Sequence, residues 1–300
     1  MDYRFIREIC DKHGAACTEN EHLAPYTSFK IGGSCPIMAK PNGTDCLCEL
    51  IKALNRVQIP FRVMGRGSNL LISDSGVDVP VILISSDMGG VSFNGEKIVC
   101  GAGAALNAVC KASLEHGSTG LEFAYGIPGS VGGALYMNAG AYGGEMKDIA
   151  ESCTYIDESG EIHTLTADKM DLSYRHSFFS GKPFIITEIT FSLKQGDKEQ
   201  IQARMQDLMQ KRRDKQPLDY PSAGSTFKRP EGDFAGRLIE EAGLRGFTVG
   251  GAAVSEKHCG FVINKGGATF NDVKNLIDII KQRVKETSGR DLSCEVIIWE

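Results

Sequence analysis

Ser225 is the residue of this chain whose surroundings most suggest chemistry. It lies in the segment Ser222-Ala-Gly-Ser-Thr-Phe-Lys-Arg-Pro, directly after a glycine and ahead of two cations. Gly224 lets the backbone approach a bound molecule closely, and a positioned hydroxyl can donate a proton to a strongly basic acceptor. In isolation, however, this serine is typical of a turn hydroxyl bonded to nearby backbone. An active role therefore depends on partners elsewhere in the chain.

Two charged residues are candidates for those partners. Arg175, in Tyr174-Arg-His-Ser-Phe-Phe, offers a planar fork that suits a carboxylate, although a lone arginine after a tyrosine is typical of a surface salt bridge. Glu295 stands at the start of the apolar run 294–299. Burying a carboxylate there costs free energy unless a hydrogen bond, an ion pair or a functional role compensates for it. A buried ion pair is the alternative interpretation of Glu295.

Two glycine-containing loops follow predicted strands. The run Gly65-Arg-Gly-Ser-Asn-Leu-Leu comes after a strand at 61–64, so its backbone amides could converge on a phosphate. A Rossmann site is excluded, because Leu70 replaces the third glycine and the following residues favour a strand where a helix must begin. The run Gly101-Ala-Gly-Ala-Ala-Leu fails the same test at Leu106. Alone, either loop is typical of a plain turn.

A third glycine cluster, at 126–144, carries more information. So many glycines in one stretch permit close backbone approach to a bulky ligand, and Gly129, Ser130 and Gly132 could cradle a diphosphate. The alternative is a sharply bent, closely packed segment without a ligand. We expect a long functional loop here, since such loops in compact domains usually serve a function.

The elements that must position these residues indicate an α+β fold. Short strands alternate with helices up to a composition change near residue 196, where a highly charged helical stretch, 197–215, begins. The turn Asp157-Glu-Ser-Gly predicts a hairpin. We therefore expect two domains, 1–196 and 197–300. The predicted strands of the first are 36–40, 61–64, 79–84, 97–100, 152–156 and 183–193, and its predicted helices are 45–57 and 104–116.

The final third has a similar mixed pattern. We expect helices at 233–242 and 271–287, the second capped by Asn271 and carrying an apolar stripe that faces the core. Strands are expected at 249–254, 260–263 and 294–299.

Composition excludes several classes of protein. The 300 residues carry a formal charge of −5 with both signs mixed along the chain, which gives no basic face for nucleic acid. No stretch is apolar enough to span a membrane, and the amino terminus lacks a signal peptide, so we expect a cytoplasmic protein. The ten cysteines are expected to be reduced thiols, and the Cys46-Leu-Cys pair to lie on an amphipathic helix without a metal.

Taken together, the motifs closely resemble the UDP-N-acetylenolpyruvoylglucosamine reductase family. The resemblance covers nearly the whole chain, and five motifs occur in the family's order and spacing: the Gly65 run, Ile127-Pro-Gly-Ser-Val-Gly-Gly, the Tyr174 run, the Ser222 run and the terminal Glu295-Val. It implies noncovalent FAD in a two-lobed domain of the vanillyl-alcohol-oxidase type and a smaller α+β domain for substrate. It also implies that NADPH reduces FAD, which then reduces the enolpyruvyl group of UDP-N-acetyl-3-O-(1-carboxyvinyl)-glucosamine to UDP-N-acetylmuramate for peptidoglycan.

The resemblance assigns roles to the candidate residues. Ser225 is implied as the proton donor, Arg175 as the cation that stabilises the developing charge, and Glu295 as its assistant, which would act in the neutral form if its pKa is raised. The implied FAD-binding residues are Gly65, Arg66, Gly67, Ser68, Asn69, Leu70, Gly126, Pro128, Gly129, Ser130, Gly132 and Gly133. The implied substrate contacts are Tyr174, Lys215, Lys228, Arg229 and Asn264.

Three points remain open from the sequence. No insertion between Tyr174 and Ser222 could carry the tyrosine lid found in one branch of the family, so the chain resembles the shorter branch. A flavin oxidase of the same fold is a second hypothesis. A nucleotide-binding module without turnover is a third, which the joint presence of Arg175, Ser225 and Glu295 disfavours.

Overall fold

A computed structural model describes residues 2–300 of the chain. The chain forms two compact units, each built from more than one segment. The first unit contains the residues up to Glu19 together with 37–66 and 79–211; the second contains 20–36, 67–78 and 212–300. Each unit buries a hydrophobic core of its own.

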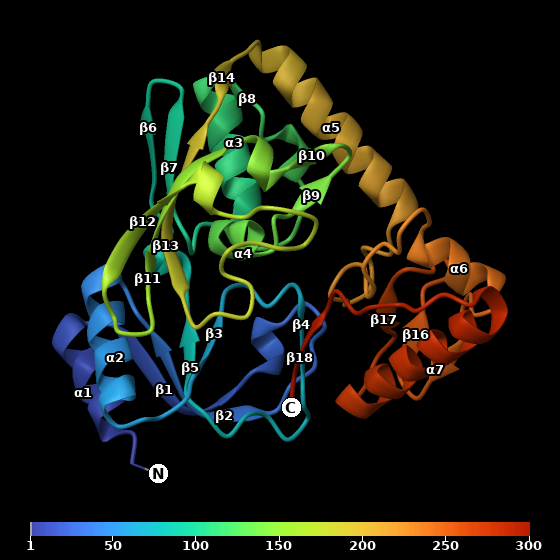
Figure 1. The fold of residues 1–300 in the computed structure, drawn as a ribbon, viewed down its shortest axis with the longest axis horizontal. Helices are drawn as coiled ribbons and strands as arrows, with labels where there is room; N and C mark the ends of the chain where they lie inside the picture. Colours follow the sequence, from blue (N-terminus) through green and yellow to red (C-terminus); the bar gives the residue numbers. More distant parts are fainter. Residues whose placement is uncertain (1) are drawn as a thin grey trace. The chain divides into compact units, whose positions relative to one another are not determined.

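The largest sheet of the first unit is antiparallel and five-stranded, in the order β12-β11-β13-β7-β6 (Figure 1). The predicted hairpin is confirmed, with a turn held by Asp157, whose carboxylate accepts the backbone N–H groups of Ser159 and Glu161. The strands are β6 (Val91–Asn94), β7 (Lys97–Gly101), β11 (Ala150–Ile156), β12 (Ile162–Thr166) and β13 (Ile185–Ser192).

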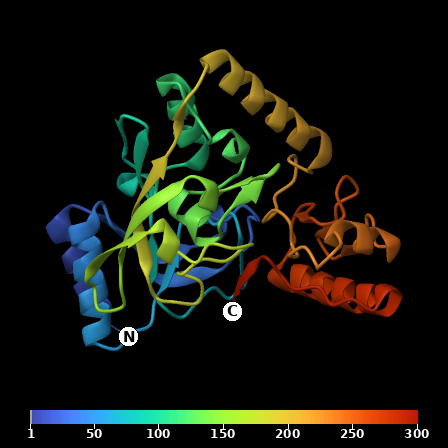
Figure 2. The same ribbon diagram turned by 45° about the horizontal axis from the view of Figure 1, so that its top comes forward.

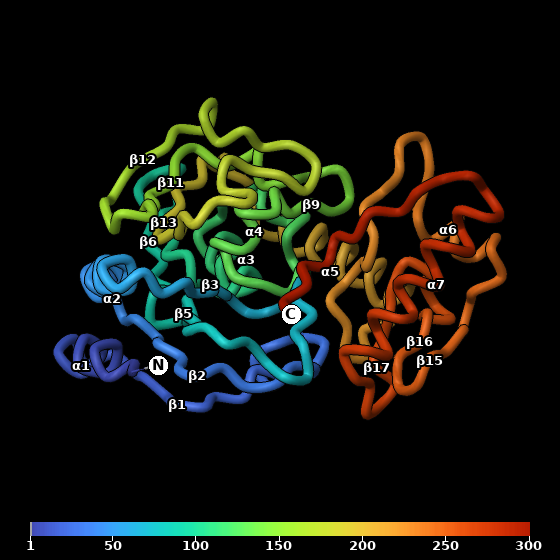
Figure 3. The backbone as a smooth tube through the Cα atoms, turned by 60° about the horizontal axis from the view of Figure 1, so that its bottom comes forward, coloured from blue at the N-terminus to red at the C-terminus, as the bar shows by residue number. Residues whose placement is uncertain are grey.

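A second sheet has the order β1-β2-β5-β3, in which β5 pairs in parallel with both β2 and β3. Its strands are β1 (Ala16–His22), β2 (Ser34–Lys40), β3 (Arg62–Met64) and β5 (Val81–Leu83). Helices α1 (Arg4–His13) and α2 (Thr44–Arg56) lie side by side in Figures 1 and 3, and both contribute apolar residues to the core of the first unit.

From the sequence we expected the glycine-rich stretch 126–144 to form one long loop. That prediction is wrong. The stretch contains a short helix, α4 (Val131–Tyr136), and a two-stranded ribbon of β9 (Gly140–Ala141) and β10 (Gly144–Glu145). Hydrophobic Val131, Ala134 and Leu135 are buried, which explains why this segment folds locally despite its glycines. The unit also contains α3 (Leu106–His116), the paired β8 (Ser118–Thr119) and β14 (Lys194–Gln195), and most of α5 (Lys198–Lys215).

The second unit combines a three-stranded antiparallel sheet with two helices. Its strands are β15 (Thr248–Val249), β16 (Ala252–Val254) and β17 (Val262–Asn264). Helices α6 (Ala235–Glu241) and α7 (Phe270–Ser288) lie side by side (Figure 2). Strand β18 (Ile297–Trp299) pairs in parallel with β4 (Leu70–Ile72), which joins two distant parts of the sequence.

Three details of the second unit differ from expectation. The predicted strand 249–254 is two strands, because Gly250 turns the chain with φ +54°. The long helix is capped by Thr269, which exchanges hydrogen bonds with Asp272 in a capping box, and not by Asn271. The carboxyl-terminal strand begins at Ile297, so Glu295 precedes it.

Several other features of the described residues bear on the composition. All ten cysteines are free thiols, and Cys46 and Cys48 lie on the amphipathic helix α2. Over residues 2–300, no helix is both long and apolar enough to cross a membrane, and no cluster of side chains suits a metal ion.

Candidate active site

The loop after β3 and the start of α4 meet within the first unit. A Cβ atom at Gly65 would stand 2.5 Å from the Oγ of Ser130, so only glycine fits there without movement. Ser130 caps α4, and its hydroxyl accepts the N–H of Gly133 at 3.3 Å. Gly65 and Ser130, which come from the two predicted cofactor-binding runs, are therefore neighbours in space.

The start of α4 is fixed from both sides by backbone hydrogen bonds. Val131 N–H donates to Ala104 at 2.9 Å, Gly132 N–H donates to Ala102 at 2.9 Å, and Gly129 accepts from Leu106 at 3.1 Å. Of the remaining predicted cofactor residues in this unit, Gly126 and Gly129 are half-buried, whereas Arg66, Pro128 and Gly133 are exposed.

Packing explains the Gly101 run without a ligand. A Cβ atom at Gly101 would stand 2.2 Å from the carbonyl oxygen of Met88, and one at Gly103 would stand 1.7 Å from that of Ser85. These two glycines allow the turn after β7 to pack against 85–90. The plain turn that the sequence favoured is what the structure shows.

Arg175 lies at the tip of a tight turn in a conformation that side chains rarely adopt. Its φ is +53°, and the turn is closed by two hydrogen bonds between the backbones of Ser173 and His176. The guanidinium carbon lies 5.1 Å from the centre of the Tyr174 ring, and that tyrosine is 48% exposed. Strained residues of this kind cluster at ligand-binding sites, which makes Arg175 a functional candidate on structural grounds.

The turn that carries Arg175 is anchored by Asn138, which is fully buried. The Asn138 amide donates to the Ser173 carbonyl at 2.9 Å and to the Glu145 carboxylate at 2.6 Å, while its oxygen accepts from Lys147 N–H at 2.9 Å. On the other side of the turn, the Ser177 hydroxyl donates to the carbonyl of Tyr136 at the end of α4. The glycine-rich segment and the arginine turn are thus one connected structure.

Ser225 lies in the second unit on an extended segment between two others. It is half-buried and forms an antiparallel bridge with Phe261, and Gly224 before it has φ +77°. Two residues later, Phe227 forms an antiparallel bridge with Cys294. The serine segment is therefore held on both edges.

Thr226 connects the segments of Ser225 and Glu295. Its N–H donates to Gly260 O at 2.9 Å, and its hydroxyl accepts from Val262 N–H at 3.0 Å. Its carbonyl accepts from Glu295 N–H at 2.9 Å, and the residue is 1% exposed. The backbones of Ser225 and Glu295 are consequently fixed relative to each other by one buried residue.

Asn69 links the Glu295 segment in turn to the Gly65 run, and we call the hydrogen bonds of Thr226 and Asn69 together the Thr226 ladder. Its side-chain amide donates to the Glu295 carbonyl at 3.0 Å, and its own carbonyl accepts from Ile297 N–H at 3.0 Å. Nearby, Gly67 has φ +57°, and a Cβ atom there would stand 2.2 Å from Tyr26 O. Ser68 is half-buried and Leu70 is buried in β4.

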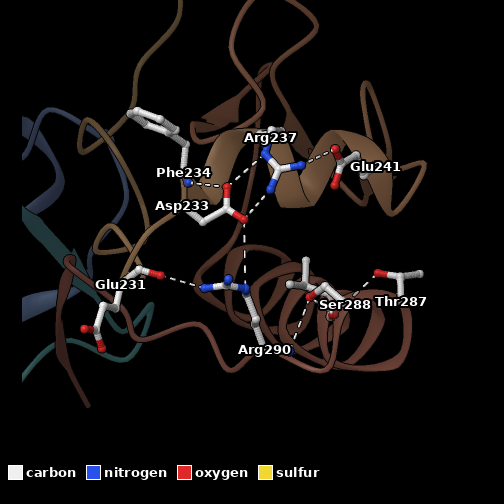
Figure 4. A network of polar contacts seen from close by, with 9 residues as sticks. Glu231, Asp233, Phe234, Arg237, Glu241, Thr287, Ser288 and Arg290 are labelled. Carbon is white, nitrogen blue, oxygen red and sulfur yellow. Dashed lines mark hydrogen bonds and ion pairs between the residues drawn. The ribbon is translucent and has the colours of Figure 1, made fainter.

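The segment after Lys228 is held by an ion-pair network, shown in Figure 4. Asp233, 6% exposed, accepts from Phe234 N–H at 2.7 Å and from the Arg237 guanidinium, and this pairing keeps the pKa of its carboxyl below the usual range. Arg290 donates to the Glu231 carbonyl at 2.6 Å. The network fixes the backbone of residues 231–234 against α6 and the end of α7.

The predicted substrate contacts of the second unit differ in their surroundings. The Arg229 guanidinium lies 4.7 Å from the centre of the Phe234 ring, Lys228 is half-buried, and Lys215 is exposed at the end of α5. Asn264 is buried, and its amide group bonds Phe29, Gly266 and Ala268. These bonds give Asn264 a structural role whatever else it contacts.

Comparison with known proteins assigns both parts of the chain. The model of the UDP-N-acetylenolpyruvoylglucosamine reductase C-terminal domain matches residues 216–299, and an FAD binding domain model matches 36–166. The UDP-N-acetylenolpyruvoylglucosamine reductase of Caldanaerobacter subterraneus subsp. tengcongensis is 50% identical over 279 residues, which are 93% of this chain and 92% of that protein. That of Clostridium novyi is 46% identical over 98% of this chain and 94% of its own length.

The chain belongs to the UDP-N-acetylenolpyruvoylglucosamine reductase family. It is an FAD-dependent oxidoreductase, and NADPH is the reductant that the family uses. The crystal structure of the Thermus caldophilus reductase is similar, with a TM-score of 0.81 and 34% identity, covering 95% of this chain and 99% of that one. An alkyldihydroxyacetonephosphate synthase shares the fold alone, with a TM-score of 0.51 and 15% identity over 65% of this chain and 41% of that chain.

The glycine contacts of the reductase suit FAD. Gly65 packs directly against Ser130, so the backbones of the two predicted cofactor-binding runs lie close together, as a ligand that contacts both requires.

Sequence reasoning missed the residues that hold the candidates in place. Asn138 and Thr226 were not singled out, although both stand inside motifs that were. For Asn138, an asparagine among glycines was an available signal, since asparagine tolerates the left-handed φ of +40° found there. For Thr226 no local signal existed, because its three hydrogen bonds reach segments distant in the sequence.

Proposed function

We propose that Arg175, Ser225 and Glu295 carry out the reduction that defines the family. The substrate is UDP-N-acetyl-3-O-(1-carboxyvinyl)-glucosamine, the product is UDP-N-acetylmuramate, and the place of action is the cytoplasm. When bound, FAD relays a hydride from NADPH to the β carbon of the enolpyruvyl group. The observation that carries the proposal is the buried link through Thr226, which fixes the segments of Ser225 and Glu295 together.

Arg175 has the role of holding the substrate carboxylate. Hydride addition to the enolpyruvyl group pushes electron density into that carboxylate, which gains enolate character and needs a cation aimed at it beforehand. The left-handed turn supports this role, because Asn138 and Ser177 fix it and little reorganisation is then needed during the reaction.

Ser225 has the role of protonating the α carbon. A serine hydroxyl is a weak acid, so transfer requires the strongly basic enolate and a short donor distance. The bridges at Phe261 and Cys294 restrict the motion of the segment, and half-burial limits competing water.

Glu295 has the role of supporting the enolate as it forms. A carboxyl group near developing negative charge is most useful as a neutral hydrogen-bond donor, which requires protonation in the complex with substrate. Its backbone is bonded on both sides, by Thr226 O to its N–H and by the Asn69 amide to its carbonyl.

A single-turnover experiment tests the serine assignment. FAD-loaded enzyme is reduced with NADPH without oxygen and then mixed with the enolpyruvyl nucleotide, and flavin reoxidation is followed by its visible absorbance. Ser225→Ala is expected to slow reoxidation by at least about 10²-fold, within the range of lost general acids, while reduction by NADPH stays at the wild-type rate. Unchanged reoxidation in this variant would overturn the assignment.

Admitting oxygen to the reduced enzyme in place of the nucleotide, and recording the visible spectrum of the purified protein, separates the two alternative hypotheses. A flavin oxidase would be reoxidised quickly by oxygen and would ignore the enolpyruvyl nucleotide. A binding module without turnover would bind the nucleotide in a colourless preparation.

A further inference from the structure

A chain of polar contacts in the first unit leads from an ion pair to the strained turn of Arg175. The carboxylate of Glu145, on β10, lies 2.6 Å from Lys147 Nζ, and the Glu145 side chain is 29% exposed. The same carboxylate accepts a hydrogen bond from the Asn138 amide, which also donates to the Ser173 carbonyl. The roles proposed for the reduction do not include Glu145.

The ribbon of β9 and β10 holds Glu145 in place. Its loop has only two residues, Tyr142 and Gly143, with φ of +54° and +89°, as in the tight hairpin loops that fix strand register. Glu145 pairs with Gly140 across the ribbon, and a Cβ atom at Gly140 would stand 2.8 Å from that of Glu145. Beyond the ribbon, Glu145 N–H donates to the Asp148 carboxylate at 2.9 Å. The backbone of Glu145 is therefore fixed on both sides.

The buried side chain of Asn138 satisfies its hydrogen bonds in one orientation only. Its amide N–H groups face two acceptors, the Glu145 carboxylate and the Ser173 carbonyl, and its oxygen faces the Lys147 N–H. Rotating the amide by half a turn would place its oxygen against both acceptors. Because an ionised carboxylate accepts and never donates, Glu145 keeps the N–H groups on the side of Ser173. Loss of this carboxylate would leave a buried N–H unpaired.

The Ser173 carbonyl connects this amide to Arg175. Ser173 and His176 exchange two backbone hydrogen bonds, of 3.1 and 3.2 Å, and Arg175 stands inside the turn that they close, at φ +53°. A residue keeps such a conformation only where its surroundings hold it there. An amide that no longer holds the Ser173 carbonyl would therefore let the turn relax and displace the guanidinium.

We propose that Glu145 is a positioning residue for Arg175, on which it acts through Asn138 and Ser173. The proposal rests on the function proposed for Arg175, which is to hold the substrate carboxylate. Glu145 transfers no proton in this role: it sets the direction of one amide, and that amide sets the place of the guanidinium. The step that depends on Glu145 is the one in which Arg175 stabilises developing charge, the reoxidation of reduced flavin by the enolpyruvyl nucleotide.

A double-mutant cycle on flavin reoxidation tests this coupling. FAD-loaded enzyme is reduced with NADPH without oxygen and mixed with the enolpyruvyl nucleotide, and its visible absorbance is followed. Glu145→Ala is expected to slow reoxidation about tenfold, since a small displacement of a catalytic group is enough for such a loss, while reduction by NADPH keeps the wild-type rate. In the Arg175→Ala background, Glu145→Ala is expected to have no further effect.

The cycle separates failure of this coupling from failure of the proposed function. An Arg175→Ala variant that reoxidises at the wild-type rate would overturn the role of Arg175, and the positioning role of Glu145 with it. If Arg175→Ala is slow and Glu145→Ala slows both backgrounds equally, or slows neither, the positioning role alone is wrong.

Further variants exclude a general loss of folding as the cause. Glu145→Gln keeps an oxygen that can accept from Asn138, so it should recover most of the reoxidation rate. Asn138→Gly removes the amide, and glycine adopts the φ of +40° without strain, so this variant should be at least as slow as Glu145→Ala. Glu151→Ala is the control, since Glu151 forms a comparable ion pair with Lys97, and it should behave as wild type. Wild-type reoxidation in Asn138→Gly would contradict the proposal.

Discussion

At the scale of single residues, the left-handed backbone of Arg175 lowers the free energy of unfolding, while its side chain serves the proposed reaction. A side chain in the left-handed region costs about 1–2 kcal/mol, and natural turns avoid this cost with glycine. The φ of +53° at Arg175 supports the proposed role, in which the guanidinium must lie at that point.

This cost predicts a contrast between two variants of Arg175. Both Arg175→Gly and Arg175→Ala remove the guanidinium, so both should lose at least about 10²-fold in kcat. Only glycine relieves the strained φ, so Arg175→Gly should exceed Arg175→Ala in free energy of unfolding by about 1 kcal/mol. Steady-state kinetics and urea unfolding measure the two quantities. Equal stabilities would show that the turn relaxes in the alanine variant.

Thr226 allows a prediction about positioning without chemistry. Thr226→Val keeps the shape of the side chain but leaves Val262 N–H unpaired in a buried place, a cost of about 1–3 kcal/mol. We expect the segments of Ser225 and Glu295 to shift relative to each other. This shift should reduce kcat roughly tenfold and leave the rate of flavin reduction by NADPH unchanged. Thr226→Ser, which retains the hydroxyl, should restore the rate of the reoxidation step. A purely structural role would lower stability in Thr226→Val and leave that rate unchanged.

At the scale of elements, the contact between the Gly65 loop and α4 is the most specific structural feature among the residues proposed to bind FAD. The Cβ of Gly65→Ala would overlap the Ser130 hydroxyl, so this variant should be purified with less FAD, seen as a lower ratio of visible to ultraviolet absorbance. Removing the hydroxyl in Gly65→Ala/Ser130→Ala should recover part of the flavin. Full FAD content in Gly65→Ala would mean that the loop moves without cost.

A comparison of the expected and observed elements shows which parts of the fold could be predicted from the sequence. The hairpin at Asp157 and the apolar stripe of α7 were predictable because turn chemistry and helical periodicity act over a few residues. The pairing of β18 with β4 was not, since nothing near Leu70 specifies a partner more than two hundred residues away. For the same reason the family motifs located Ser225 and Glu295, whereas their link through Thr226 became visible only in the structure.

At the scale of the whole molecule, acid stability should depend on capping carboxylates. Asp272 accepts the N–H groups of Thr269 and Gly251, and these bonds lower its pKa below the ordinary 3.8. A lowered folded-state pKa stabilises the protein above the unfolded value and loses this contribution as pH falls through the folded value. Asp272→Asn should therefore be less stable than wild type at neutral pH, with the difference shrinking below about pH 4 in thermal melts. A difference independent of pH would exclude this cause.

The hydrogen bond from Asn69 to Glu295 has a further consequence for how the enzyme becomes active during folding. It joins positions separated by 226 residues, and contacts of such range form late because the chain must first lose the entropy of closing a long loop. The local hairpin of β11 and β12 faces no such delay. In refolding from denaturant, secondary structure should return before reductase turnover, and the lag between them would report how fast residues 69–72 join residues 295–299.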